Sequence, residues 1–120
     1  MKRTKPAMQK PMQASTSSCL SCIESKRTEA WWLNRHAEKL AEVDNAKADI
    51  VFLGDSITHA WEVEGEQAWK HYFAQSSCIN LGYAGDRTEH LLWRIEQGEL
   101  ALESADFVCL LVGTNNAGHR

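Results

Sequence analysis

Three positions in this chain carry residue types that suit attack on an acyl carbonyl: Ser56, Gly85 and Asn115. A serine hydroxyl becomes a nucleophile when a base takes its proton, and hydrogen-bond donors must stabilise the oxyanion that then forms. A glycine can bring its backbone N–H close to a substrate oxygen, and an asparagine carboxamide can add a further donor. Each motif alone is a weak signal, because glycines and polar residues are common where strands end. Their order and spacing are more specific.

The spacing of these positions matches the repeat of an α/β fold. Gly85 follows Ser56 by 29 residues and Asn115 follows Gly85 by 30, close to the roughly 30 residues of a βαβ unit. Each position comes after a short apolar run typical of a buried strand, at 49–53, 78–81 and 107–112.

Helices are predicted between these strands. Apolar residues recur at three- and four-residue intervals near 28–45, 68–73 and 88–98, as one face of a helix requires. For the last helix we expect Asp86 or Thr88 to act as the N-cap, with Glu89 as the capping-box partner of Asp86.

Strands that alternate with helices predict right-handed crossovers and a parallel sheet. The fold class is therefore α/β, a three-layer, flavodoxin-like domain with strand order 2-1-3 and residues 107–112 at an uncovered edge. The carboxyl ends of parallel strands meet where open α/β sheets bind ligands. We expect Ser56, Gly85 and Asn115 to lie together at that edge.

The motifs resemble those of the SGNH (GDSL-type) hydrolases. The resemblance lies in Gly-Asp-Ser-Ile-Thr at 54–58, in residues 80–88 and in Gly-Thr-Asn-Asn at 113–116, and it covers about residues 29–120. Leu-Leu-Trp-Arg at 91–94 makes the chain similar to the branch related to the catalytic subunits of platelet-activating-factor acetylhydrolase.

The resemblance implies a serine esterase that hydrolyses small acyl or acetyl esters through an acyl-enzyme. It implies that Ser56 is the nucleophile and that the Ser56 N–H, the Gly85 N–H and the Asn115 side chain form the oxyanion hole. Asp55 then has a structural role in the turn or the following helix. The expected partner is a small-molecule ester, and no metal or organic cofactor is expected.

The Asp-x-x-His block that supplies the base in this family has no counterpart in the 120 residues. His59 and His119 follow Ser56 and Asn115 closely, but surface or loop-edge roles are commoner than catalysis for such histidines. We therefore expect residues 28–120 to form a partial SGNH hydrolase domain, truncated after its third strand, that has little activity as a fragment.

Composition and charge are those of one small domain preceded by a polar segment. The 120 residues are 43% hydrophobic and 24% charged, with a formal net charge of −3, which is ordinary for a globular domain. Residues 1–27 carry +5 and residues 28–120 carry −8. Because the basic segment has no interleaved aromatic residues, we predict a disordered tail and no nucleic-acid partner.

Apolar runs are short throughout the sequence. None approaches the roughly 18 to 20 residues of a membrane span, and no signal peptide is visible, so we expect a cytoplasmic protein without a membrane span. We also expect Cys19, Cys22, Cys78 and Cys109 to be reduced thiols. Self-association of the chain stays open.

Two other functional classes are compatible with the sequence. A pocket with oxyanion donors but no base suits a non-catalytic binding module for acylated sugars or lipids. A nucleotide-binding module is the other, because glycines precede a helix start after the second strand. That alternative lacks both G-x-G-x-x-G and the P-loop pattern G-x-x-x-x-G-K-[ST].

Overall fold

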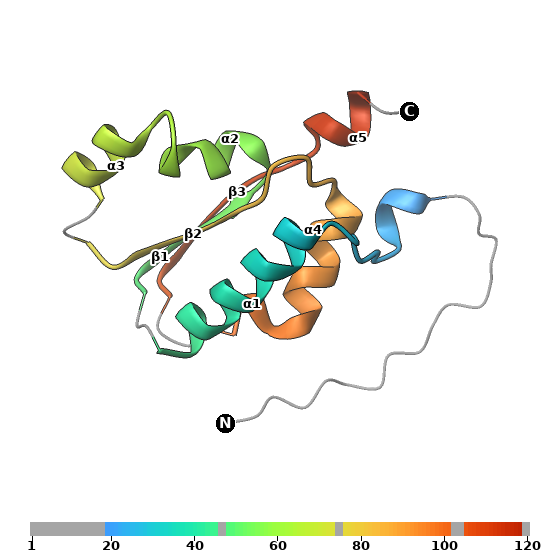
Figure 1. Cartoon of the computed structure of the whole chain (residues 1–120), viewed down its shortest axis with the longest axis horizontal. Helices are drawn as coiled ribbons and strands as arrows, with labels where there is room; N and C mark the ends of the chain where they lie inside the picture. Colours follow the sequence, from blue (N-terminus) through green and yellow to red (C-terminus); the bar gives the residue numbers. More distant parts are fainter. Residues whose placement is uncertain (1–18, 46–47, 74–75, 102–104, 119–120) are drawn as a thin grey trace.

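The computed structural model describes residues 19–45, 48–73, 76–101 and 105–118. A small parallel sheet forms the middle layer, with α1 (Ala30–Asn45) and α4 (Thr88–Arg94) over one face and α2 (Ser56–His59) and α3 (Glu66–Tyr72) over the other (Figure 1). This is the predicted α/β arrangement, with helices on both faces of the sheet.

The sheet has three parallel strands in the order β2-β1-β3. They are β1 (Ile50–Gly54), β2 (Cys78–Gly82) and β3 (Phe107–Leu111). Gly54 at the end of β1 is level with Gly82 on one side and Leu111 on the other. The predicted strands, their order and their direction are confirmed, and the three carboxyl ends lie at one edge.

A compact apolar core lies between the sheet and the layer of α1 and α4. It contains Val51 and Leu53 of β1, Ile79 and Leu81 of β2, and Leu91 of α4. Burial of each such side chain is worth about 1.5 to 3 kcal/mol. On the other face, the Phe52 ring packs against the rings of Trp69 and Phe73 at 5.3 and 5.2 Å between centroids.

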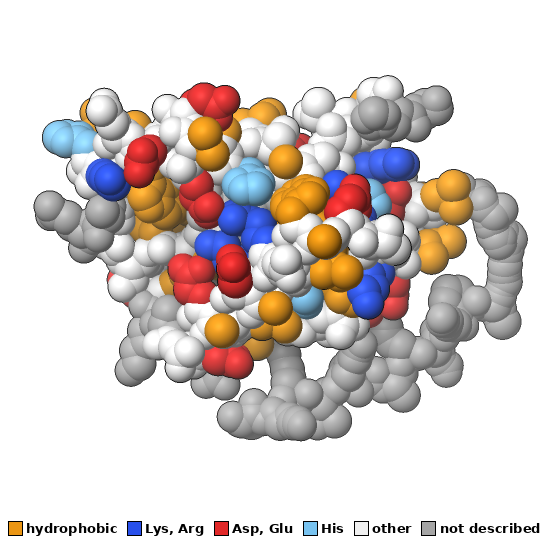
Figure 2. Space-filling model, viewed as in Figure 1, with side chains coloured by type: hydrophobic (Ala, Val, Ile, Leu, Met, Phe, Trp, Pro, Cys, Tyr) orange, Lys and Arg blue, Asp and Glu red, His pale blue; other side chains and the backbone are white. Residues whose placement is uncertain are grey.

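Strand β3 forms an open edge of the sheet, as predicted. Its side chains are exposed along the whole strand, including 68% of Phe107 and 61% of Leu110. Elsewhere, on the face shown in Figure 2, apolar side chains are scattered among charged ones. Among the described residues, no helix is long and apolar enough to cross a membrane.

The predicted capping of α4 is wrong. Thr88 is the first helical residue rather than the cap, and the Asp86 carboxylate is fully buried away from the helix start. The His90 ring accepts a hydrogen bond from the Arg87 N–H at 3.0 Å, and the Asn116 side chain accepts one from the Thr88 N–H at 2.9 Å. A residue 28 positions away therefore satisfies a donor that local sequence was expected to satisfy.

Part of the predicted tail is packed against the domain. Residues 1–18 lie outside the described residues, but the Ser25 N–H donates to the Glu89 carbonyl at 3.0 Å and the Thr88 hydroxyl donates to the Ser21 carbonyl at 2.9 Å. Residues 19–27 thus lie along α4, so the expectation of disorder up to residue 27 does not hold for this part.

The expectation of four reduced thiols is wrong for one pair of cysteines. Cys19 and Cys22 are joined by a disulfide, whereas Cys78 and Cys109 are free. The turn Leu20–Cys22 brings the Cα atoms of Cys19 and Cys22 to 5.4 Å, within the range that a disulfide needs.

A buried ionic network joins the two helices of this layer to the sheet. The Arg94 side chain is completely buried between the carboxylates of Asp86 and Glu99. It also donates to the carbonyl oxygens of Leu81 and Gly54, and its guanidinium lies 3.7 Å from the Tyr83 ring centroid. One side chain therefore connects α4 to both neighbouring strands.

We predict that Arg94→Leu lowers the free energy of unfolding by about 3 to 5 kcal/mol, because two buried carboxylates lose their shared partner. Arg87→Leu is the matched control, since this arginine is the N-cap residue at the other end of α4 and its side chain is 40% exposed. We expect the control to cost less than about 1 kcal/mol. Urea unfolding of both variants measures the difference, and equal losses would contradict the role of the network.

Candidate active site

The candidate site lies at the carboxyl edge of the sheet. Ser56 comes two residues after the end of β1, Gly85 three residues after β2, and Asn115 is the second residue of α5 (Thr114–Gly118), which follows β3. Since Gly54 is level with Gly82 and Leu111, all three motifs leave the sheet at the same end. The Asn115 side chain donates to the Asp86 carbonyl at 2.8 Å, which brings the second and third motifs into direct contact.

Two glycines allow α2 to cross the strand ends closely. A Cβ at Gly54 would lie 2.5 Å from the Thr58 hydroxyl oxygen of α2 and 2.4 Å from the Leu111 carbonyl oxygen, and one at Gly82 would lie 2.4 Å from the His59 nitrogen. Real Cβ atoms do not come this close to backbone atoms, so both positions need glycine for close packing rather than for an unusual φ. The helix that begins at Ser56 therefore lies directly on the ends of β1 and β2.

Ser56 is the first residue of α2 and is exposed to solvent. The preceding Asp55 caps the helix, because its Oδ1 accepts a hydrogen bond from the Ile57 N–H at 3.0 Å. Asp55 is 1% exposed, and its Oδ2 has no partner among the described residues. Asp55 thus has the structural role that was expected, whereas Ser56 is accessible to solvent.

Gly85 lies in a tight turn whose other peptide groups are bonded. The Tyr83 N–H donates to the Gly54 carbonyl and the Asp86 N–H closes the turn on the Tyr83 carbonyl. The Ala84 N–H donates to the His59 ring, and the Ala84 carbonyl accepts from Arg27 at 2.8 Å. Within the described part of the chain, no acceptor contacts the Gly85 N–H.

The neighbouring Asn116 has a different role from Asn115. Its carboxamide bridges the start of α4: the oxygen accepts from the Thr88 N–H, and the nitrogen donates to the Thr88 hydroxyl and to Glu89 at 3.1 and 3.0 Å. Asn116 therefore holds α5 against α4 and keeps Asn115 beside the turn of Gly85. Sequence reasoning missed this residue, because its partners are far away in the chain.

The histidines near the site are engaged in structural contacts. The His59 Nδ1 accepts from the Ala84 N–H at 3.0 Å, so that nitrogen cannot also take a proton from Ser56. Burial lowers the pKa of His59, and the nearby charge of Arg35 lowers it further. Burial likewise lowers the pKa of His90. His119 lies outside the described residues.

A buried histidine–carboxylate pair occurs elsewhere in the domain. The His36 Nδ1 lies 2.6 Å from Glu99, which also accepts from the Tyr83 hydroxyl and from Arg94. Burial by itself would raise the pKa of Glu99, but the hydrogen bond from His36 and the charge of Arg94 lower it. This pair stabilises the packing of α1 and has no contact with Ser56 among the described groups.

A shallow hollow of about 330 Å³ borders Gly85. Its lining combines the turn with the segment that precedes α1 and the start of α4: Lys26, Arg27, Thr28, Glu29, Gly85, Arg87 and His90. Across residues 19–45, 48–73, 76–101 and 105–118, no group of three His, Cys, Asp or Glu side chains is placed to hold a metal ion.

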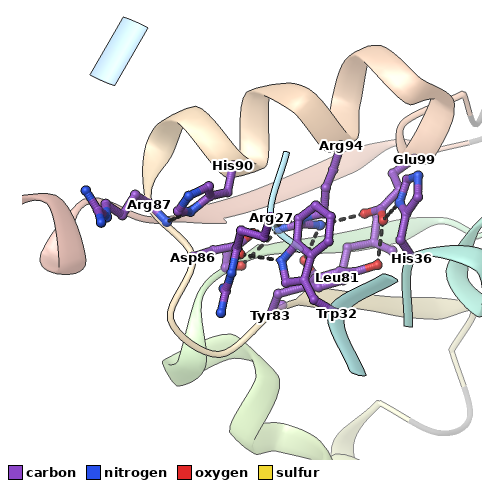
Figure 3. Close-up of polar contacts among 12 residues, drawn as sticks. Arg27, Trp32, His36, Leu81, Tyr83, Asp86, Arg87, His90, Arg94 and Glu99 are labelled. Atoms are coloured by element: carbon purple, nitrogen blue, oxygen red, sulfur yellow. Dashed lines mark hydrogen bonds and ion pairs between the residues drawn. The ribbon is translucent and has the colours of Figure 1, made fainter. Parts of the chain in front are cut away.

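Arg27 and Arg94 have contacts in this region that sequence analysis did not predict. They converge with Trp32 on the Asp86 carboxylate (Figure 3). Arg94 does carry a sequence signal, because it lies three residues after Leu91 on the face expected to be apolar. Arg27 carries none, since it lies in the segment assigned to the tail.

The His59 contact predicts a pH dependence of stability. Folding favours the neutral ring, so its contribution is present above the unfolded pKa of about 6.5 and is lost as the pH falls below that value. We expect His59→Asn, whose side-chain oxygen can still accept from the Ala84 N–H, to show a smaller loss of unfolding free energy between neutral pH and pH ~5.

Urea unfolding at a series of pH values measures this effect. His90→Asn is the parallel variant, because burial lowers the pKa of that ring as well. The slope of the unfolding free energy against pH is proportional to the number of protons taken up on unfolding, and each replacement should lower that number by at most one. A His59→Asn slope equal to that of the unchanged chain would contradict the structural role of the ring.

Comparisons with known proteins identify the family of this chain. The model of the GDSL-like Lipase/Acylhydrolase family matches residues 52–120. Platelet-activating factor acetylhydrolase IB subunit alpha1 from Bos taurus is 33% identical over 100 residues, which cover 81% of this chain and 41% of that protein. The IB subunit beta homolog from Drosophila melanogaster is 40% identical over 85 residues, covering 71% of this chain and 37% of that protein.

The matched region includes all three motifs of the candidate site. The chain spans about two fifths of the length of these curated relatives. The family match covers more than half of the chain and contains Ser56, Gly85 and Asn115. The chain belongs to the GDSL-like lipase/acylhydrolase family, a family of hydrolases.

Proposed function

We propose that the whole protein containing this chain is a serine esterase in which Ser56 attacks the acyl carbon of a small ester. The Ser56 N–H, the Gly85 N–H and the Asn115 carboxamide stabilise the oxyanion. The observation that carries this proposal is the Gly85 N–H, which has no acceptor among the described residues and lies in a turn whose neighbouring peptide groups are bonded. A donor held rigidly and left unpaired is what an oxyanion hole requires.

Asn115 suits the same role. One N–H of its carboxamide is held by the Asp86 carbonyl, which fixes the orientation of the amide group. A carboxamide nitrogen carries two hydrogens, so a second donor stays available beside Gly85. Exposed Ser56 at the end of the neighbouring strand completes the set.

The relatives support a proposal for the substrate class. Their names describe acetylhydrolases of platelet-activating factor, so we propose that this protein also cleaves short acyl esters, acetyl esters first among them. The proposed reaction releases the alcohol and leaves an acyl group on the Ser56 oxygen. Water then attacks this acyl-enzyme and releases the acid.

The proton acceptor is the remaining part of the proposal. Among the described histidines, the rings of His36, His59 and His90 each bond a structural partner. His71 is exposed in the last turn of α3, with its ring against Tyr72. We propose that the base belongs to a part of the whole protein that these 120 residues do not include, as the greater length of the relatives allows.

A binding module for acylated sugars or lipids is the second candidate. The engagement of His59 with the turn of Gly85 favours it, because donors without a base bind a carbonyl but do not turn it over. The two candidates differ in one measurable property, which is turnover by the full-length protein.

We predict that Ser56→Ala abolishes hydrolysis of p-nitrophenyl acetate and labelling by a fluorophosphonate, because both reactions need the Ser56 oxygen. The full-length protein is compared with the Ser56→Ala variant and with Ser77→Ala, a control at another exposed serine. Peptide mapping locates the label. Ester binding without any turnover would support the binding module, and undiminished turnover in Ser56→Ala would reject the assignment.

We predict that Asn115→Ala lowers kcat by about a hundredfold to a thousandfold with little change in KM, because the oxyanion bond strengthens in the transition state. Asn116→Ala is the comparison variant. Its side chain holds α5 against the start of α4, so this variant should lower the melting temperature and should lower kcat less than Asn115→Ala does. An effect of Asn115→Ala confined to KM would show that this residue binds substrate instead.

A further inference from the structure

The direction of the Gly85 N–H depends on the orientation of one peptide group, the one between Ala84 and Gly85. Residues 83–86 form a β-turn closed by the bond from the Asp86 N–H to the Tyr83 carbonyl at 3.2 Å, and Gly85 has a φ of +82°. This φ is the value that the third position of a type II turn requires. Rotation of the central Ala84–Gly85 peptide converts such a turn to type I and reverses the direction of the Gly85 N–H.

Arg27 holds that central peptide. Its Nη1 donates to the Ala84 carbonyl at 2.8 Å and to the Asp86 carboxylate at 2.8 Å. The Ala84 carbonyl and the Gly85 N–H belong to the same peptide, which is planar and trans. Fixing the carbonyl toward Arg27 therefore directs the Gly85 N–H to the opposite side.

The arginine is itself held from several directions. Glu29 accepts from its Nε and Nη2 at 3.2 and 2.9 Å, and the guanidinium lies 5.4 and 5.9 Å from the ring centroids of Trp31 and Trp32. Its side chain is 13% exposed. The bond from Arg27 pulls the pKa of Glu29 down to about 2, so the pair stays charged over the working pH range.

The charge of Arg27 also acts through the peptide. A cation bonded to a carbonyl oxygen polarises the amide, and this makes the N–H of that peptide a stronger donor. The Gly85 N–H is the donor so strengthened, and it has no acceptor among the described residues.

We propose that Arg27 is a positioning residue for the proposed reaction: it locks the Ala84–Gly85 peptide in the type II orientation and polarises its N–H toward the developing oxyanion. This role rests on the proposed function, since it deepens the oxyanion hole assigned to Gly85. It places a residue from the segment before α1 in control of a donor supplied by the loop after β2.

Arg35 is a matched control for this role. It is buried to the same degree, with an 11% exposed side chain, and it also bonds a carboxylate, Glu62, and a backbone carbonyl, that of Gly82 at 2.9 Å. It does not bond the Ala84–Gly85 peptide. The Arg27 and Arg35 variants therefore both lose packing and a positive charge. Only the Arg27 variant also loses the hydrogen bond to the Ala84 carbonyl.

Kinetics of the full-length protein test the proposal. We expect Arg27→Met to lower kcat about tenfold to a hundredfold, less than removal of a whole oxyanion donor, with little change in KM. Arg35→Met should keep kcat within a factor of about three. Guanidinium chloride at low millimolar concentration should partly restore kcat in Arg27→Ala, whereas sodium chloride should not. Equal losses in both methionine variants, without rescue, would overturn the proposal.

Nuclear magnetic resonance of the 120-residue chain gives a readout that needs no turnover. The chain has 7 glycines, so selective 15N-glycine labelling reduces the amide signals to those of seven residues, one of which is Gly85. A type II turn places the Ala84 Hα close to the Gly85 amide proton, and a type I turn does not. We expect a strong Overhauser contact in the unchanged chain and in Arg35→Met, and a weakened one in Arg27→Met.

The two proposals fail in different ways. Turnover that survives Ser56→Ala would reject the esterase assignment, while the Overhauser contact would still decide whether Arg27 fixes the turn. An unchanged contact in Arg27→Met would overturn the role of Arg27 and leave the role of Ser56 standing.

Discussion

The Asp86 carboxylate joins segments that are far apart in the chain. Its Oδ1 accepts from Arg27 and from the Trp32 indole at 2.8 and 2.7 Å, and its Oδ2 accepts from Arg94 at 2.9 Å. An unpaired charge at this depth would be strongly destabilising. Because each partner comes from a different segment, the pre-helical segment, α1 and α4 are held in one arrangement around the loop after β2 (Figure 3).

The same residue connects this packing to the candidate site. The Asp86 carbonyl accepts from Asn115, and the Asp86 N–H closes the turn that contains Gly85. From the other side of the sheet, His59 of α2 accepts from the Ala84 N–H. The Gly85 turn is therefore held from both layers of helices. Donors fixed in this way need no reorganisation when charge develops, which is the main source of electrostatic stabilisation in such sites.

The order of the strands places Ser56 on the best-supported part of the sheet. β1 is central and bonds a strand on each side, whereas β3 has an exposed outer edge. Gly54 receives the Tyr83 N–H and the Arg94 guanidinium at its carbonyl. Ser56 therefore begins α2 two residues after a backbone position that is hydrogen-bonded on both sides. Asn115, in contrast, follows the edge strand β3.

Several sequence predictions failed because they assumed local partners. The expected capping box at Asp86 and Glu89 is replaced by His90 and by distant Asn116. Asp86 is not available as a cap, since Arg27 and Arg94 bind its two carboxylate oxygens. Similarly, Arg27 was assigned to a disordered tail on composition, but ion pairs with Glu29 and Asp86 hold it against the domain.

Sequence alone was sufficient for the strands, their parallel order and the positions of Ser56, Gly85 and Asn115, because hydrophobic periodicity and glycines after apolar runs are local signals that repeat about every 30 residues. The tertiary structure alone decided which donors are free, which histidines are engaged and that Arg27 contacts the Ala84 carbonyl. Hydrogen bonds such as those of Ala84 with His59 and with Arg27, which join residues 25 and 57 positions apart, leave no periodic trace. They exist only after the apolar core has brought the segments together.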